Sequence, residues 1–165
     1  MSRKIKLGIL GGGGDSLIGV LHRVAANMFD KYEIVGGVFN PNFKENIEFA
    51  KTLGLNSSRI YEDYESLIEE ESKLNSSEKM QVISVLTPNF LHYPMAKKLL
   101  ENNFHVICEK PLTTTYKEAI ELQQIQKEKN AVFAVTHTYT GYPMVRQMTK
   151  MISDGIIGDI QKVDA

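Results

Sequence analysis

The sequence contains one cysteine, no surplus of either charge and no long apolar run. Cys108 is the only cysteine, which excludes an internal disulfide framework and favours a reducing, cytoplasmic compartment. The 19 Lys and Arg residues nearly balance the 20 Asp and Glu residues, so nothing indicates a nucleic-acid partner or a membrane surface. Residues 1–6 lack the apolar stretch of a signal peptide, and no apolar run reaches the roughly 20 residues that cross a bilayer.

The composition is that of an ordinary globular domain, with 42% hydrophobic and 24% charged residues. Short β-branched runs alternate with amphipathic stretches of helical period, which is the pattern of βαβ units. We therefore expect residues 1–165 to form one α/β domain in three layers, built on a mostly parallel, doubly wound sheet of about six strands.

The expected elements follow one another along the chain. Strands are predicted at residues 5–10, 33–39, 57–61, 80–86, 104–108 and 131–136. Helices are predicted at residues 17–28, 44–53, 64–74, from the turn after residue 89 to about 102, 116–129 and 143–153. We expect Cys108 to be a small buried strand residue and the acidic residues 69–71 to lie on a solvated helix face. Residues 160–163 look extended without a following partner strand, which favours a domain junction there.

Four consecutive glycines join the first strand to the first helix. Glycines there let the backbone approach a pyrophosphate, which the helix start attracts through its amides and dipole. Gly11 and Gly13 fit the first two positions of a dinucleotide fingerprint, and the helix starts at Leu17 and Ile18. The third glycine is displaced, because Gly19 stands three residues later than the standard spacing from Gly13 requires. A tight turn that binds nothing is the alternative.

The second predicted strand ends at Phe39 and Asn40, where an acidic residue would hold the ribose of adenosine. A neutral Asn40 can bond a ribose hydroxyl without repelling a ribose phosphate. NAD and NADP therefore both stay open, with NAD slightly favoured.

Polar residues also follow the strand at residues 80–86. Thr87, Pro88 and Asn89 come directly after it, and His92 lies one turn into the next helix. Ligands of open α/β sheets bind beyond the carboxyl ends of the strands, which favours a binding role for these residues. Helix capping by Thr87 and Asn89, with local packing of His92, is the alternative.

Glu109, Lys110 and Pro111 follow the next strand. Pro111 biases Lys110 to an extended backbone, which would direct the ammonium group toward a nicotinamide or substrate. A solvated ion pair without a role is the alternative. After the last strand, residues 136–143 carry several hydroxyls and His137, which suits a polyhydroxylated ligand, although a generic polar loop would look similar.

The chain resembles the glucose-fructose oxidoreductase, inositol dehydrogenase and MocA family through motifs that occur in order: Gly11 and Gly13 with Gly19 and His22, Thr87-Pro88-Asn89 with His92, and Glu109-Lys110-Pro111. The resemblance covers essentially the whole chain. It implies an N-terminal Rossmann domain that binds NAD or NADP, and a second α/β domain that these 165 residues do not include. It also implies hydride transfer between nicotinamide and a sugar, polyol or cyclitol hydroxyl, a homo-oligomer in full-length form, and no metal.

The same resemblance implies a role for each matching position. Lys110 would be the catalytic lysine beside nicotinamide and substrate, and Glu109 would hold the nicotinamide ribose or position the lysine. The general base is expected in the second domain, so this chain should bind cofactor without turning over substrate. His22 is expected to be a packed position. The expected cofactor contacts are Gly11, Gly13, Leu17, Ile18, Asn40, Thr87, Pro88, Asn89, His92, Glu109, Lys110, Pro111 and His137.

A non-catalytic regulator that binds a dinucleotide or a sugar on the same fold is the rival hypothesis. Lys110 favours an enzyme, because a sensor needs no group at the point of hydride transfer. A second domain with a histidine facing Lys110 would distinguish the two.

Overall fold

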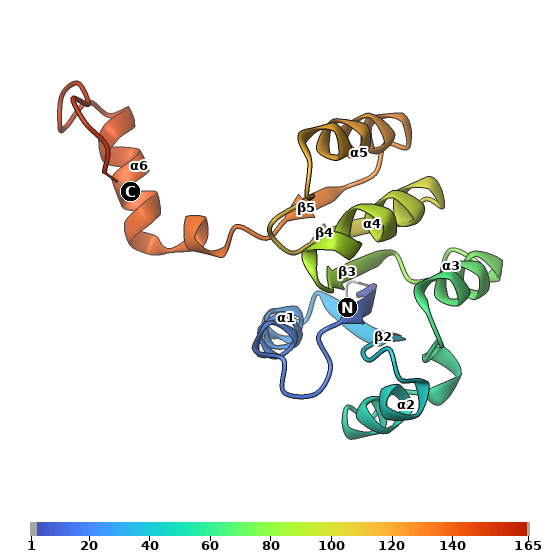
Figure 1. Ribbon diagram of the computed structural model, residues 1–165. Coiled ribbons are helices and arrows are strands. Elements are labelled where there is room, and N and C mark those ends of the chain that lie inside the picture. The colour runs from blue at the N-terminus through green and yellow to red at the C-terminus, as the bar shows by residue number, and fades with distance from the viewer. Residues whose placement is uncertain (1–2, 165) are drawn as a thin grey trace. The chain divides into compact units, whose positions relative to one another are not determined.

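A computed structural model describes residues 3–164 of the chain (Figure 1). The chain divides into two compact units, residues 1–135 and residues 136–165, which are described separately. No helix within residues 3–164 is both long and apolar enough to cross a membrane.

The first unit is built on five strands: β1 (Ile5–Gly11), β2 (Tyr32–Val38), β3 (Val82–Leu86), β4 (His105–Cys108) and β5 (Phe133–Val135). All four neighbouring pairs are parallel, and the order is β2-β1-β3-β4-β5. The helical segments are α1 (Leu17–Met28), α2 (Phe43–Thr52), η1 (Ser57–Arg59), α3 (Tyr64–Lys73), η2 (Asn89–Leu91), α4 (His92–Glu101) and α5 (Tyr116–Glu128).

The strand order reverses between β1 and β3. The chain leaves β1 in one direction to reach β2, and then proceeds in the other direction through β3, β4 and β5. Because parallel crossovers are right-handed, α1 covers one face of the sheet and α3, α4 and α5 cover the other (Figure 1). Such a reversal is where open α/β sheets bind ligands, outside the carboxyl ends of the strands.

Alternate residues of the strands point to opposite faces of the sheet and contribute to two apolar clusters, as expected for a sheet covered on both faces. Leu7 and Ile9 of β1 pack with Ala26 of α1 and Ala50 of α2. On the other face, Leu10 joins a larger cluster formed with the buried sides of α3, α4 and α5. Cys108 is fully buried in this larger cluster, as expected, and burial raises the pKa of its thiol to about 12.

The α/β fold class and the parallel, doubly wound sheet are confirmed; the sheet has five strands, because the strand predicted at residues 57–61 is not formed. Residues 57–61 form η1 and a single bridge between Gly37 and Ile60 instead of a strand. The side chain of Asn56 accepts a hydrogen bond from the Ser58 amide at 3.0 Å, which satisfies the backbone locally and competes with strand pairing.

The expectation that residues 69–71 form a solvated acidic face is wrong for Glu71, which is fully buried. Its carboxylate accepts bonds from Nε and Nη2 of Arg59 at 2.6 and 2.7 Å, from the Tyr61 hydroxyl at 2.5 Å, and from the Met80 amide at 2.8 Å. Burial and this carboxylate raise the pKa of Tyr61 well above its usual range. Glu71 thus ties α3 to the segments on either side of it.

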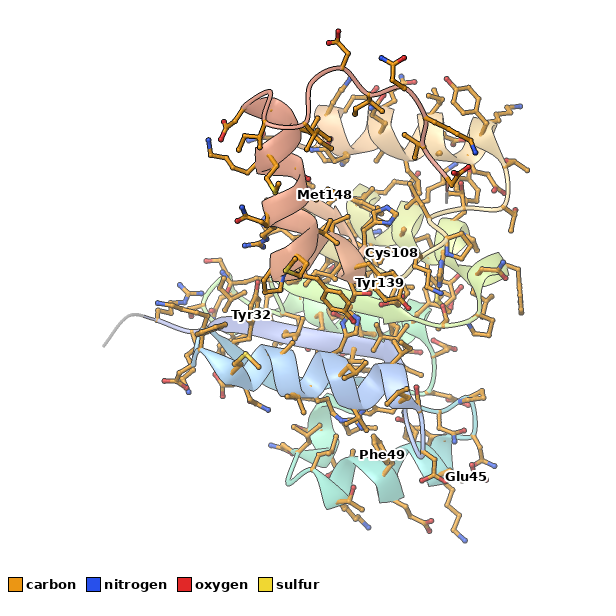
Figure 2. The ribbon with its side chains drawn as sticks, turned by 90° about the vertical axis from the view of Figure 1, so that its left-hand side faces the viewer. Tyr32, Glu45, Phe49, Cys108, Tyr139 and Met148 are labelled. Carbon is orange, nitrogen blue, oxygen red and sulfur yellow. The ribbon has the colours of Figure 1, made fainter. Side chains whose placement is uncertain are left out.

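The second unit contains η3 (Thr138–Gly141) and α6 (Pro143–Ser153). Proline at the first turn suits a helix start, since that position needs no amide donor. Met144 and Met148 stand four residues apart on α6 and are both exposed; Met148 is labelled in Figure 2. The helix matches the predicted range, whereas residues 160–163 form no strand.

Replacing Glu71 by Gln should destabilise the chain by about 3–5 kcal/mol, because the half-buried Arg59 guanidinium would lose its fully buried charged partner. Chemical denaturation followed by circular dichroism measures the change.

Glu70→Gln is the matched control, since Glu70 is exposed on the same helix and pairs only with Lys73. It should change stability by less than about 1 kcal/mol. Equal stabilities for the two variants would contradict the structural role given to Glu71.

Candidate functional site

The turn between β1 and α1 is a backbone cradle. Gly11, Gly12 and Gly14 adopt φ values of +83°, +68° and +55°, which side chains disfavour. Gly13 donates its amide to the Phe39 carbonyl at 3.1 Å, and a Cβ on Gly13 would lie 2.5 Å from that oxygen. The turn therefore lies directly against the end of β2.

Gly19 takes the place of the displaced third glycine. A Cβ at this position would lie 1.8 Å from the Gly12 carbonyl oxygen, so only glycine lets α1 approach the turn this closely. Ser16 caps the helix by accepting a bond from the Gly19 amide at 3.1 Å. The amides of Leu17 and Ile18, which have no acceptor within the helix, remain at its positive end, where phosphate groups bind.

A cleft of about 490 Å³ opens beside this turn. Gly11, Gly13, Asn40, Thr87 and Pro88, which the sequence motifs single out, all line it. Glu62, Asp63 and Tyr64 also line the cleft, although no sequence motif marks them.

The bridge between Gly37 and Ile60 brings those three missed residues beside the end of β2. Burial is the main cause, and a hydrogen bond to Glu65 the second, of a rise in the pKa of Tyr64 to about 12, so its hydroxyl stays neutral. Buried Asn46 holds the two walls together: its side chain accepts from the Phe39 amide and donates to the Tyr61 carbonyl, both at 2.8 Å.

The cleft carries negative charge at the end of β2. Asn40 donates to Glu45 at 2.9 Å and accepts from the Asn42 amide at 2.8 Å. Glu62 and Asp63 also line the cleft, and the lining found among residues 3–164 includes no lysine or arginine. Hydrogen bonds from the Ser66 amide and hydroxyl lower the pKa of Asp63, so this carboxylate is ionised at neutral pH.

Arg23 supports the glycine turn from α1 and does not line the cleft. Its Nη1 donates to the Gly12 carbonyl at 2.7 Å, and its guanidinium lies over the Phe49 ring at 5.1 Å from the centroid. Figure 2 shows Phe49 on α2, on the side toward α1, with Glu45 one turn earlier. Burial lowers the pKa of Arg23.

The turn after β3 contributes to the cleft without capping a helix. Thr87 and Pro88 line the cleft, whereas Asn89 is exposed and starts η2. No side chain caps η2 or α4, so the capping alternative is not what the structure shows. His92 is buried, and its ring contacts the carbonyls of Thr87 and Pro111 and does not line the cleft.

The turn after β4 presents a lysine beside a buried carboxylate. Glu109 is 8% exposed and contacts Nε2 of His22 at 3.0 Å through one oxygen. Its other oxygen accepts from the Lys110 amide at 3.2 Å. Lys110 itself is exposed and forms no ion pair among the described residues, and its bond to Pro111 is cis. Glu109 therefore pairs with His22 of α1, and the solvated ion pair between Glu109 and Lys110 is not formed.

These turns lie at one edge of the sheet. Gly11 of β1 pairs with Leu86 of β3, and Val85 of β3 pairs with Cys108 of β4, so the glycine turn, the Thr87 turn and the Lys110 turn follow one another across the switch point. His137 belongs to the second unit, and its role stays a prediction.

The arrangement fits an extended ligand with a central anion. A helix start with open amides suits a pyrophosphate, the cleft beside β2 suits a flat ring and its ribose, and the Lys110 turn lies on the other side of the helix start.

Comparisons with known proteins agree with this geometry. Residues 5–149 match the family described as "Oxidoreductase family, NAD-binding Rossmann fold". An uncharacterized oxidoreductase of Bacillus subtilis, YfiI, is 34% identical over 165 residues, which are 99% of this chain and 42% of that protein.

Among solved structures, the chain is similar to an inositol dehydrogenase homolog from Azotobacter vinelandii complexed with NAD+, with 37% identity and a TM-score of 0.92. The similarity covers 96% of this chain and 40% of that one. A second structure of the same homolog, with NADH and myo-inositol, gives the same identity and TM-score and covers 96% and 41% of the two chains.

The chain therefore spans about two fifths of the length of these relatives. The family match covers most of its length, and the glycine turn, the Thr87 turn and the Lys110 turn all lie within the matched residues. The chain belongs to the glucose-fructose oxidoreductase, inositol dehydrogenase and MocA family of oxidoreductases and forms their NAD-binding Rossmann domain.

Proposed function

We propose that this chain is the cofactor-binding part of a dehydrogenase that transfers hydride between NAD and a hydroxyl of a sugar, polyol or cyclitol. The observation that carries the proposal is the placement of the glycine turn after β1 and Lys110 after β4 at the same end of one sheet, with the Thr87 turn after β3 between them. The first is suited to the pyrophosphate, and the second to the reacting end of the cofactor.

Three features of the chain account for cofactor binding. The amides of Leu17 and Ile18 would bond the pyrophosphate, which Gly13 allows to come close to the backbone. The adenosine would lie in the cleft between Asn40 and Thr87. Glu109 is directed at His22 and would help to fix the nicotinamide side of the site through the turn that it precedes.

The charges of the cleft support NAD over NADP. The 2′-phosphate of NADP would stand at the end of β2, where Asn40 is already bonded to Glu45. A phosphate there would face a carboxylate without a cation among the lining residues. A ribose hydroxyl would instead find an acceptor.

Lys110 would act at the reacting centre. Bound nicotinamide supplies the hydride acceptor. The Lys110 ammonium would orient the substrate hydroxyl and stabilise the negative charge that develops on its oxygen as the hydride leaves carbon. The residue that takes the hydroxyl proton is proposed to lie outside these 165 residues, so this chain alone should bind cofactor without turnover.

The substrate class rests on the relatives. The Azotobacter vinelandii homolog was solved with NADH and myo-inositol, a ring that carries a hydroxyl on each carbon. The ammonium group of Lys110 could polarise one hydroxyl of such a ring. We expect the choice among such substrates to be made by residues beyond this chain, in the part of the relatives that it does not span.

Cofactor binding is tested by titrating the chain into NADH and following nicotinamide fluorescence. Binding is expected, and Gly19→Ala should weaken it at least about tenfold, or ~1.4 kcal/mol, because the methyl group would push α1 from the turn.

Gly54→Asn is the matched control, because this residue follows α2 outside the glycine turn, a side chain there meets open space, and asparagine tolerates positive φ. It should leave the NADH affinity within about twofold of the original. No binding at millimolar NADH would count against the proposal.

The preference for NAD is tested with Glu45→Gln. This variant should raise the affinity for NADPH about tenfold, or ~1.4 kcal/mol, while leaving NADH binding nearly unchanged, because it removes the carboxylate behind Asn40. Glu48→Gln, one turn along the same helix, should change neither affinity. Tighter binding of NADPH than of NADH by the unaltered chain would refute this part of the proposal.

The role of Lys110 is tested in a protein that contains this chain together with the second domain proposed for it. Lys110→Met should lower kcat about 10²–10³-fold, the size expected for losing a group that stabilises developing charge, with little change in cofactor affinity. Lys117→Met, an exposed lysine of α5, should have no effect. Unchanged turnover in Lys110→Met would remove this residue from the mechanism, whereas no turnover by the unaltered protein would favour the regulator.

A further inference from the structure

His92 is a buried titratable residue that joins two of the turns at the functional edge. Its side chain is 1% exposed at the first turn of α4. Nε2 lies 2.8 Å from the Thr87 carbonyl oxygen, and Nδ1 lies 2.7 Å from the Pro111 carbonyl oxygen. The ring thus spans from the turn that lines the cleft to the turn that presents Lys110.

Both ring nitrogens of His92 face groups that only accept hydrogen bonds. A backbone carbonyl has no hydrogen to donate, and proline has no amide that could serve in its place. A neutral imidazole has one N–H and one nitrogen lone pair, so it can donate to only one carbonyl. Its unprotonated nitrogen would then point its lone pair at the lone pairs of the other carbonyl oxygen, which is repulsive. Only the imidazolium donates to both.

We propose that His92 is a positioning residue that carries a proton on each nitrogen and, as a double donor, holds the Thr87 turn and the Lys110 turn at a fixed spacing for the dinucleotide. The consequence for the dinucleotide rests on the proposed function. The protonation state itself does not, because it follows from the contacts of the ring.

Two effects oppose a charged His92, and the hydrogen bonds offset them. Burial penalises an imidazolium, and the start of α4 is the positive end of a helix dipole. Against this, two charge-assisted bonds of 2.7 and 2.8 Å are short and strong. A neutral ring would forfeit one of these bonds.

The charged and titratable groups on neighbouring elements are engaged elsewhere. On the Lys110 turn, Glu109 contacts His22 and Lys110 is exposed. At the end of β4, the raised pKa of Cys108 keeps its thiol neutral. On α4 and α5, three groups bond to one another and not to His92: Tyr93, Lys97 and Glu121. The two carbonyls are thus the hydrogen-bond partners that decide its protonation.

His105 provides an internal comparison because its ring has the opposite requirement. Its Nδ1 accepts a hydrogen bond from the Val132 amide at 3.1 Å, which requires a lone pair. One spectrum of the chain therefore contains a histidine that should be protonated at both nitrogens and one that should lack a proton at Nδ1.

The protonation of His92 is tested by long-range nitrogen-15 to proton correlation spectra of the chain without nucleotide. We expect both His92 nitrogens to resonate as N–H at neutral pH, while His105 Nδ1 resonates as an unprotonated nitrogen. A spectrum in which either nitrogen of His92 is unprotonated at neutral pH would overturn the proposal, whether or not the chain binds NADH.

The positioning role is tested by NADH titration of His92→Phe and His92→Gln. Phe removes both donors and should weaken NADH binding about tenfold, whereas Gln can donate to one carbonyl and should restore part of the loss. His105→Phe should leave affinity unchanged. In the unaltered chain, NADH affinity should fall over the pH range in which the spectrum shows His92 losing a proton.

Equal NADH affinity in His92→Gln, His92→Phe and the unaltered chain would overturn the positioning role. If His92→Phe does not fold, the His92→Gln titration and the pH series decide the question. A chain that binds no NADH at all would instead contradict the proposed function, while the spectrum would still decide the protonation of His92.

Discussion

The close approach of α1 to the turn after β1 is the contact on which the functional edge depends. It exists because neither Gly12 nor Gly19 has a side chain, and a Cβ on Gly19 would lie 1.8 Å from the Gly12 carbonyl oxygen. With the helix at this distance, Arg23 reaches that same carbonyl from one turn further along. Its neighbour His22 reaches Glu109 at the end of β4. One contact without side chains thus places the open amides of the helix start relative to the turn after β1 and to the end of β4.

Buried polar side chains hold the segments that the sheet does not pair. Asn46 connects the end of β2 to Tyr61, Glu71 connects α3 to Arg59 and Met80, and His92 connects two turns. Each is nearly inaccessible to solvent, and each has its polar atoms paired, which is the condition under which burying them is tolerated. Turns lack the repeating backbone hydrogen bonds of a strand pair. Their shape at this end of the sheet is therefore fixed by hydrogen bonds from these buried side chains.

Local signals made much of this fold predictable from sequence. Periodicity predicted the helices to within one or two residues, and the motifs after β1, β3 and β4 could be grouped because the carboxyl ends of parallel strands share an edge. The predictions that failed concerned features that depend on tertiary contacts. The burial of Glu71 depends on Arg59 and Tyr61, which come from another segment. The residues 62–64 carry no motif and reach the cleft only through the bridge at Gly37.

The distribution of charge along the edge separates the two proposed roles. At the β2 end, carboxylates dominate, and the arginine on α1 is occupied by a backbone carbonyl and an aromatic ring. At the β4 end, the carboxylate next to Lys110 in sequence is bonded to His22. Had Glu109 paired with Lys110, the ammonium would be held and its charge largely neutralised before any substrate arrived. Because Glu109 contacts α1 instead, Lys110 keeps its charge for an oxygen that gains negative charge, as the proposed hydride transfer requires.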